Sequence, residues 1–175
     1  APHAIACSTP ESAPAISTAR APPVAASGSS RAGWTRRFTP ARACRSVPIS
    51  PLRSALPEEA GFEWLPVRPG TDTALMLALV HTLVSEGLHD REFIARYCEG
   101  WETFEDYLMG RSDGVPKTAD WAAPICDVPA PQLQALARSL HGRRVLVVVA
   151  HPLQRSQHGE QPVWMGAVLA AALGQ

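Results

Sequence analysis

The strongest apolar pattern in the chain is the unbroken run Val145–Val149, in which four of the five residues are valine. An unbroken, mostly β-branched run of this length is typical of a strand that is buried on both faces of a parallel sheet. Polar residues follow at once from His151 to Gln161, and a helical apolar pattern begins after Pro162. A buried strand, a polar loop and a helix start together form the kind of corner at which open α/β sheets bind ligands.

A second corner of this kind is predicted earlier in the chain. Residues 49–52 indicate the end of a strand, and residues 62–67 alternate loosely enough to predict a short strand. The sequence Arg68-Pro-Gly-Thr-Asp72 then predicts a turn, with Thr71 or Asp72 capping the helix that follows. Gly87 is expected to end that helix. Its apolar residues recur at helical spacing and are Leu75, Met76, Leu79, Val80, Leu83 and Val84.

Short helices are predicted between the two corners. One begins at Asp90, one covers residues 102–109, one is capped by Thr118, and one follows Pro129. Because helices separate the strands, the strands are expected to pair in parallel through crossover connections. The predicted fold class is α/β, a partial Rossmann-like parallel sheet with flanking helices. Only about three strands are recognisable, so we expect uncovered apolar surface and a place within a larger domain.

Composition divides the chain near residue 47. Residues 1–46 are rich in Ala, Ser, Pro and Arg and lack apolar periodicity, which predicts a disordered segment. The first 57 residues hold nine of the 17 prolines but one of the 16 acidic residues, whereas residues 58–175 hold 15 acidic and nine basic residues. We therefore expect a disordered N-terminal segment at 1–46 and a partial domain at 47–175.

Charge and cysteine usage disfavour several classes of protein. The formal net charge is +0, which gives no general attraction to nucleic acid. No apolar run approaches the roughly 20 residues that span a bilayer. The sequence contains no P-loop, no dinucleotide fingerprint and no persuasive Ser-His-Asp order. Neither a zinc site nor a disulfide framework is predicted, because no CxxC pair occurs among Cys7, Cys44, Cys98 and Cys126.

Candidate binding chemistry lies in the two corners. Gly70 permits close approach of a ligand to the backbone, and Asp72 presents acceptors that suit a ribose or a guanine edge. Arg155 suits a phosphate, which a guanidinium can bind bidentately. His151 and His158 are candidate hydrogen-bond partners, and their spacing is a weak signal for metal. A structural alternative remains open for both corners, with the turn residues as helix caps and the loop residues as solvated side chains.

Four stretches of the chain resemble the molybdopterin oxidoreductases of the dimethyl sulfoxide reductase family. The similar subgroup contains the trimethylamine N-oxide, dimethyl sulfoxide and biotin sulfoxide reductases. The stretches occur in the family's order and spacing, and the resemblance covers residues 49–175. The sequence Gly159-Glu-Gln-Pro-Val-Trp164 leans toward biotin sulfoxide reductase. The four stretches are residues 68–83, 88–94, 110–123 and 153–165.

The resemblance implies a parent enzyme that binds molybdenum through two molybdopterin guanine dinucleotides and reduces S- or N-oxides by oxygen-atom transfer. The matched segment would belong to a Rossmann-like domain that holds one dinucleotide arm. The parent would be cytoplasmic if it is like biotin sulfoxide reductase, and periplasmic if it is like the other two. This sequence departs from the family pattern at His151-Pro152. The implied cofactor contacts are Ile49, Ser50, Gly70, Thr71, Asp72, His151, Pro152 and Arg155.

The same resemblance places other functional parts outside this chain. The family's serine ligand to molybdenum would lie upstream, and most contacts of the second dinucleotide would lie downstream. We therefore expect a non-catalytic fragment that is inactive alone, with residues 1–46 hypothesised to be a frameshifted product. The alternative is a stand-alone nucleotide-binding or interaction module without catalysis, which should unfold cooperatively.

Overall fold

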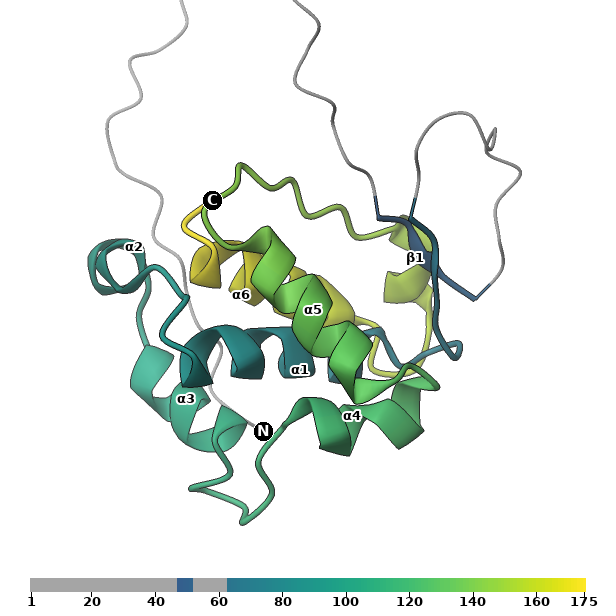
Figure 1. The fold of residues 1–175 in the computed structure, drawn as a ribbon, viewed down its shortest axis with the longest axis horizontal. Helices are drawn as coiled ribbons and strands as arrows, with labels where there is room; N and C mark the ends of the chain where they lie inside the picture. Colours follow the sequence, from purple (N-terminus) through teal and green to yellow (C-terminus); the bar gives the residue numbers. More distant parts are fainter. Residues whose placement is uncertain (1–46, 52–62) are drawn as a thin grey trace, which may run out of the picture.

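The structure, a computed structural model, describes residues 47–51 and 63–175. The predictions of disorder and of a frameshifted product at 1–46, and that of a strand beginning at residue 62, fall in part or whole outside these residues. The described part is mostly helical (Figure 1). Its helices are α1 (Asp72–Ser85), α2 (Arg91–Tyr97), α3 (Trp101–Leu108), α4 (Ala119–Cys126), α5 (Ala130–Leu140), the short 3-10 helix η2 (His151–Arg155) and α6 (Glu160–Ala172).

The sheet in the described residues is small. Strand β1 (Ile49–Ser50) pairs in parallel with β2 (Leu65–Pro66), so that Ile49 lies opposite Leu65. The indole N–H of Trp64 donates to the carbonyl oxygen of Ser50 at 3.1 Å and lies 3.2 Å from its hydroxyl oxygen. Parallel pairing is thus present, but two strands of two residues do not confirm the predicted Rossmann-like sheet.

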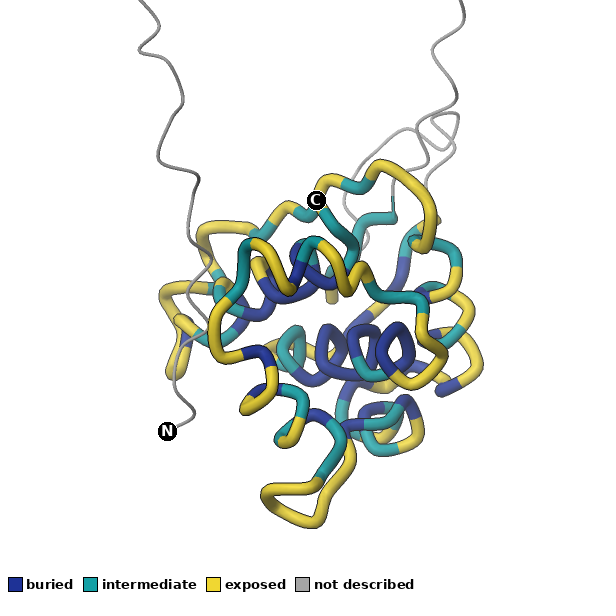
Figure 2. Tube along the Cα trace, turned by 90° about the vertical axis from the view of Figure 1, so that its left-hand side faces the viewer, coloured by how far each residue is buried: buried dark blue, intermediate teal, exposed yellow. Residues whose placement is uncertain are grey.

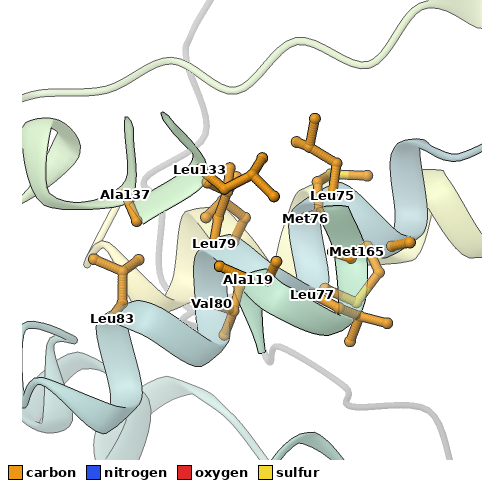
Figure 3. Close-up of a cluster of buried hydrophobic side chains, with 14 of the residues drawn as sticks. Leu75, Met76, Leu77, Leu79, Val80, Leu83, Ala119, Leu133, Ala137 and Met165 are labelled. Carbon is orange, nitrogen blue, oxygen red and sulfur yellow. The ribbon is translucent and has the colours of Figure 1, made fainter. Parts of the chain in front are cut away.

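Helix α1 forms the centre of the core. Ten of its 14 residues are buried, so its apolar surface extends beyond a single stripe. The reason is that α4, α5 and α6 all pack against it. Figure 2 shows the resulting buried interior under an exposed outer layer. Figure 3 shows side chains of α1 meeting Leu133 and Ala137 of α5, with Ala119 of α4 and Met165 of α6 nearby.

The prediction of a buried strand at Val145–Val149 is wrong. These residues are neither strand nor helix, and the side chains of Leu146 and Val148 are 86% and 78% exposed. Val147 and Val149 are half-buried and face α6, where a Cβ added to Gly166 would lie 2.5 Å from Val149 Cγ2. A strand needs a neighbouring backbone to hydrogen-bond. The described residues supply no such neighbour, so only alternate side chains of the run are covered.

The predicted helix starts at Asp90 and Thr118 are confirmed, because the groups that form each cap are close in sequence. The side chain of Asp90 accepts from the backbone N–H of Phe93 at 2.8 Å, and that of Thr118 from Trp121 at 3.1 Å, as the two caps require. Helix α6 begins at Glu160 rather than after Pro162, since proline is tolerated in a first helical turn.

A buried lysine closes the loop between α3 and α4. Lys117 is 2% exposed, and its Nζ lies 2.6 Å from Asp113 Oδ2 and 4.2 Å from the centre of the Tyr107 ring. It also donates to the carbonyl oxygen of Val115. The charge is therefore compensated where it is buried. Of the tryptophans in the described residues, Trp101 is buried, while Trp64, Trp121 and Trp164 are half-buried.

Candidate functional site

The turn at residues 68–72 joins β2 to α1. The backbone N–H and the hydroxyl of Thr71 both donate to the carbonyl oxygen of Arg68, at 3.3 and 2.7 Å. Thr71 occupies the N-cap position of α1, but its side chain makes no cap hydrogen bond. Gly70 has φ +76°, and a Cβ there would have no atom within 4 Å. The turn therefore presents open backbone at a conformation that favours glycine.

Asp72 opens α1 and is half-buried. Burial raises the pKa of its carboxyl group above the ordinary value of 3.8, and a backbone hydrogen bond partly opposes this shift. Among residues 47–51 and 63–175, no Lys, Arg or His forms an ion pair with it. A half-buried carboxylate without a cation is poorly compensated, so donors brought by a ligand would stabilise its charged form.

Residues at the end of α4 form hydrogen bonds with this turn, and these contacts were not predicted from the sequence. Arg68 binds the carboxylate of Asp127 with Nε and Nη2, at 3.0 and 2.7 Å to Oδ2. The backbone N–H of Arg68 donates to the carbonyl oxygen of Cys126 at 3.0 Å. Burial raises the pKa of the Cys126 thiol, which donates to the carbonyl oxygen of Thr71 at 3.6 Å. No sequence pattern indicates this contact, because the partners lie 55 to 59 residues apart.

The second predicted corner is built by η2 and the start of α6. His151, Pro152 and Arg155 are all exposed on η2. A Cβ at Gly159 would collide with the carbonyl group of Gln154, so glycine lets η2 sit directly against the start of α6. In the described part of the chain Arg155 has no ion-pair partner, so its guanidinium can bind an anion from solution.

A cavity of about 250 Å³ lies between the first turns of α1 and α6, and none of Gly70, Asp72 and Arg155 lines it. The first turn of α1 contributes Thr73 to its wall, and the segment between η2 and α6 contributes His158 and Gln161. Figure 1 places β1, the start of α1 and η2 toward the same end of the molecule. The pairing of β1 with β2 brings Ile49 and Ser50 next to the strand that leads into the turn. The remaining residues that line the cavity are Leu77, Tyr107, Trp164 and Met165.

The titratable side chain of His81 lies apart from both corners. It is half-buried in the middle of α1, where burial lowers its pKa. In the part of the chain that the structure describes, no three His, Cys, Asp or Glu residues are grouped to hold a metal ion. Within the same residues no helix is long and apolar enough to cross a membrane. The first corner offers a carboxylate and open backbone, which suit a ligand with N–H or O–H donors, and the second offers the guanidinium of Arg155, which suits an anion.

Comparison with known families decides the membership of the chain. Residues 49–175 match the family model described as molybdopterin oxidoreductase. The chain belongs to the molybdopterin oxidoreductase family. It is 44% identical over 131 residues to the trimethylamine-N-oxide reductase of Haemophilus influenzae, which covers 75% of this chain and 16% of that protein. It is 46% identical over 134 residues to the biotin sulfoxide reductase of Cereibacter sphaeroides, with 77% and 18% covered.

A solved structure of comparable fold is that of acetylene hydratase from Pelobacter acetylenicus. Its similarity to this chain has a TM-score of 0.65 at 25% sequence identity and covers 76% of this chain and 18% of that one. The chain thus spans 16% to 18% of the length of these relatives. Recognition of the family from the four sequence stretches is confirmed.

Membership of the molybdopterin oxidoreductases implies a molybdenum–molybdopterin cofactor in the parent protein. The residues of the corner fit part of such a group. Open space over Gly70 admits a ligand next to the backbone, and the uncompensated carboxylate of Asp72 can accept its N–H or O–H donors. The exposed guanidinium of Arg155 can bind a phosphate.

Proposed function

We propose that this chain contributes a guanine-nucleotide-binding portion to an oxidoreductase that reduces S- or N-oxides, in the manner of biotin sulfoxide reductase. The parent would use molybdenum bound by two molybdopterin guanine dinucleotides. One observation carries the proposal: the half-buried carboxylate of Asp72 stands without a cation among the described residues, beside the open backbone of Gly70. The names of the related reductases support the reaction class.

Each residue of the corner has a role in this proposal. The Asp72 carboxylate accepts hydrogen bonds from the guanine edge or the ribose hydroxyls, while Gly70 and Thr71 provide close backbone contact. Arg155 pairs with the diphosphate. When bound, the molybdenum centre supplies the two-electron chemistry of oxygen-atom transfer, and these side chains supply binding and orientation. The remaining proposed contacts, all at the edges of the two corners, are Ile49, Ser50, His151 and Pro152.

We further propose that the complete sheet of the parent is Rossmann-like, and the parallel pairing of β1 with β2 supports this proposal. The chain alone would not reduce substrate, because the resemblance implies that the metal-ligand serine lies in another part of the parent. Assay of the purified chain for oxide reduction with a dye electron donor tests that statement, and turnover would contradict it.

Binding of guanosine diphosphate by isothermal titration calorimetry tests the site. We expect saturable binding that is stronger than binding of adenosine diphosphate. Asp72→Asn should weaken binding by about tenfold or more, since a charge-assisted hydrogen bond is lost. Asp120→Asn is the matched control, because Asp120 lies exposed in the first turn of α4. Well-folded wild-type protein that binds neither nucleotide would overturn the proposed site.

The role of Arg155 is tested by comparing guanosine diphosphate with guanosine. Arg155→Gln should weaken binding of the diphosphate while leaving guanosine binding unchanged, because the guanidinium contacts only the phosphates. Arg144→Gln, an equally exposed change outside the corner, is the control. Equal weakening of guanosine diphosphate and guanosine binding would contradict a contact between Arg155 and the phosphates alone.

The alternative is a stand-alone nucleotide-binding module without catalysis. The closed core around α1 favours it, since a chain with such a core can unfold cooperatively. The two candidates differ in the fate of the Val145–Val149 run. In a stand-alone module, charged substitutions of the exposed Leu146 and Val148 should be tolerated. In the full-length parent oxidoreductase the same substitutions should abolish assembly, because a charge would be buried where another part of the protein covers these side chains.

A further inference from the structure

Asp127, at the end of α4, has an unusual backbone conformation. Its φ is 59°, and His158 is the other non-glycine residue with positive φ in the described part of the chain. Glycine adopts this conformation at no steric cost, whereas a residue with a Cβ does not. An aspartate at such a position is explained if its side chain makes a contact that glycine cannot make.

The contact is a bidentate ion pair with the first residue of the candidate turn. Asp127 accepts from Nε of Arg68 at 3.0 Å and from Nη2 at 2.8 and 2.7 Å. The neighbouring Cys126 accepts from the backbone N–H of Arg68 at 3.0 Å and donates its thiol to the carbonyl oxygen of Thr71 at 3.6 Å. Cys126 and Asp127, at the C-terminal end of α4, therefore contact Arg68 and Thr71, on either side of Gly70.

This ion pair is poorly suited to stabilise the whole fold. The side chains of Arg68 and Asp127 are 51% and 63% exposed, and exposed ion pairs contribute little to global stability. Its fork geometry instead fixes orientation, because two parallel N–H···O bonds restrict the guanidinium to one plane. The restricted residue begins the turn, and Asp72 ends it.

We propose that Asp127 is a positioning residue, which acts through Arg68 to hold the 68–72 turn in the conformation that presents Asp72 to a nucleotide. This inference rests on the proposed function of the turn. Asp127 itself contacts no ligand in this account. Loss of its carboxylate should loosen the turn and weaken nucleotide binding while leaving the core intact.

Two substitutions separate the side chain from the backbone strain. Asp127→Asn keeps the residue size and a tolerance of positive φ but removes the charge, and Asp127→Gly removes the side chain and the strain together. A matched control is available at Glu86, which holds Arg138 in an equally bidentate pair with N···O distances of 2.7 and 2.9 Å. That pair joins the end of α1 to α5, remote in the chain from the 68–72 turn.

The first measurement is hydrogen exchange of the backbone amides of Arg68, Thr71 and Leu75, which requires no ligand. All three donate within or beside the turn, at 3.0, 3.3 and 3.1 Å. Both Asp127 variants should exchange about tenfold faster at these amides. Glu86→Gln should leave them unchanged. Unchanged exchange in both Asp127 variants would overturn the inference.

The second measurement is the affinity for guanosine diphosphate. Both Asp127 variants should raise the Kd about tenfold with little change in the urea midpoint, whereas Glu86→Gln should leave the Kd unchanged. Faster exchange with unchanged affinity would overturn the positioning role. If the wild-type protein binds no nucleotide, the proposed function fails, and with it the claim that the turn presents Asp72. The exchange data would then still decide whether Asp127 holds the turn.

Discussion

Helix α1 and the run Val145–Val149 are both strongly apolar, yet they have opposite environments. Most of α1 is buried among α4, α5 and α6. The run has Leu146 and Val148 largely in solvent and only its alternate side chains against α6. A helix satisfies its own backbone hydrogen bonds, so it needs only apolar neighbours. A strand also needs another backbone, and the described residues do not provide one beside the run.

The difference shows that apolar sequence predicts burial only when the partner segments are at hand. The same contrast appears within α1. The middle of α1 is enclosed by apolar side chains, whereas its first residue, Asp72, lies half-buried beside an open turn. The core and the candidate site thus lie on different parts of one helix.

Truncation of one leucine in each region should give the largest difference. Leu83 of α1 is 0% exposed, so Leu83→Ala should lower the free energy of unfolding by about 3 kcal/mol through lost burial and a cavity. Leu146 is 86% exposed, and Leu146→Ala should change it by less than about 0.5 kcal/mol. Urea unfolding of the two variants measures both effects. Similar losses would mean that the run is covered in solution.

A smaller effect is expected at the open end of α1, with a sign set by pH. Since the native pKa of Asp72 is raised above 3.8, the native state holds this proton more tightly than the unfolded state. Stability should therefore fall as the pH rises from 3.8 through the native pKa, and Asp72→Asn should remove that fall. Because the carboxyl group of Asp72 is only half-buried, Asp72→Asn should raise the free energy of unfolding at neutral pH by less than about 1 kcal/mol.

Urea unfolding of wild type and Asp72→Asn at a series of pH values checks this expectation. Asp120→Asn again serves as the exposed control. A wild-type protein that gains stability relative to Asp72→Asn over the same pH range would show that the carboxylate has a cationic partner. A substitution that stabilises the fold and weakens nucleotide binding would mark Asp72 as a residue kept for binding.

The smallest effect is expected where α6 meets the run. Gly166→Ala should favour helix α6 by up to about 1 kcal/mol. The new Cβ would lie 2.5 Å from Val149 Cγ2, so the run must move away. Because the run is held by few contacts, we expect the two effects to offset each other to within about 0.5 kcal/mol.

Trypsin cleavage after Arg143 and Arg144 reports the displacement directly. Cleavage should be faster in Gly166→Ala and return to the wild-type rate in the double variant Gly166→Ala/Val149→Ala, which restores the space. A loss of more than about 2 kcal/mol in Gly166→Ala would contradict the view that the run is loosely held.

Much of the secondary structure could be predicted because its causes are local. The caps at Asp90 and Thr118 join groups three residues apart, and the periodicity of α1 lies within a single helix. The turn at 68–72 was also predicted, since proline and glycine specify it within five residues. Thr71 was only half correctly assigned, because its hydroxyl donates to Arg68 instead of capping α1.

By itself the sequence determined the helices, the turn and the family resemblance, which depend on short spacings. Tertiary structure alone decided that Asp127 pairs with Arg68 of the turn across 59 residues. It also decided that an apolar run predicted as a buried strand is left half in solvent. The physical reason is that local hydrogen bonds and propensities are encoded within a few residues. Burial and ion pairing depend on which distant segment arrives beside them.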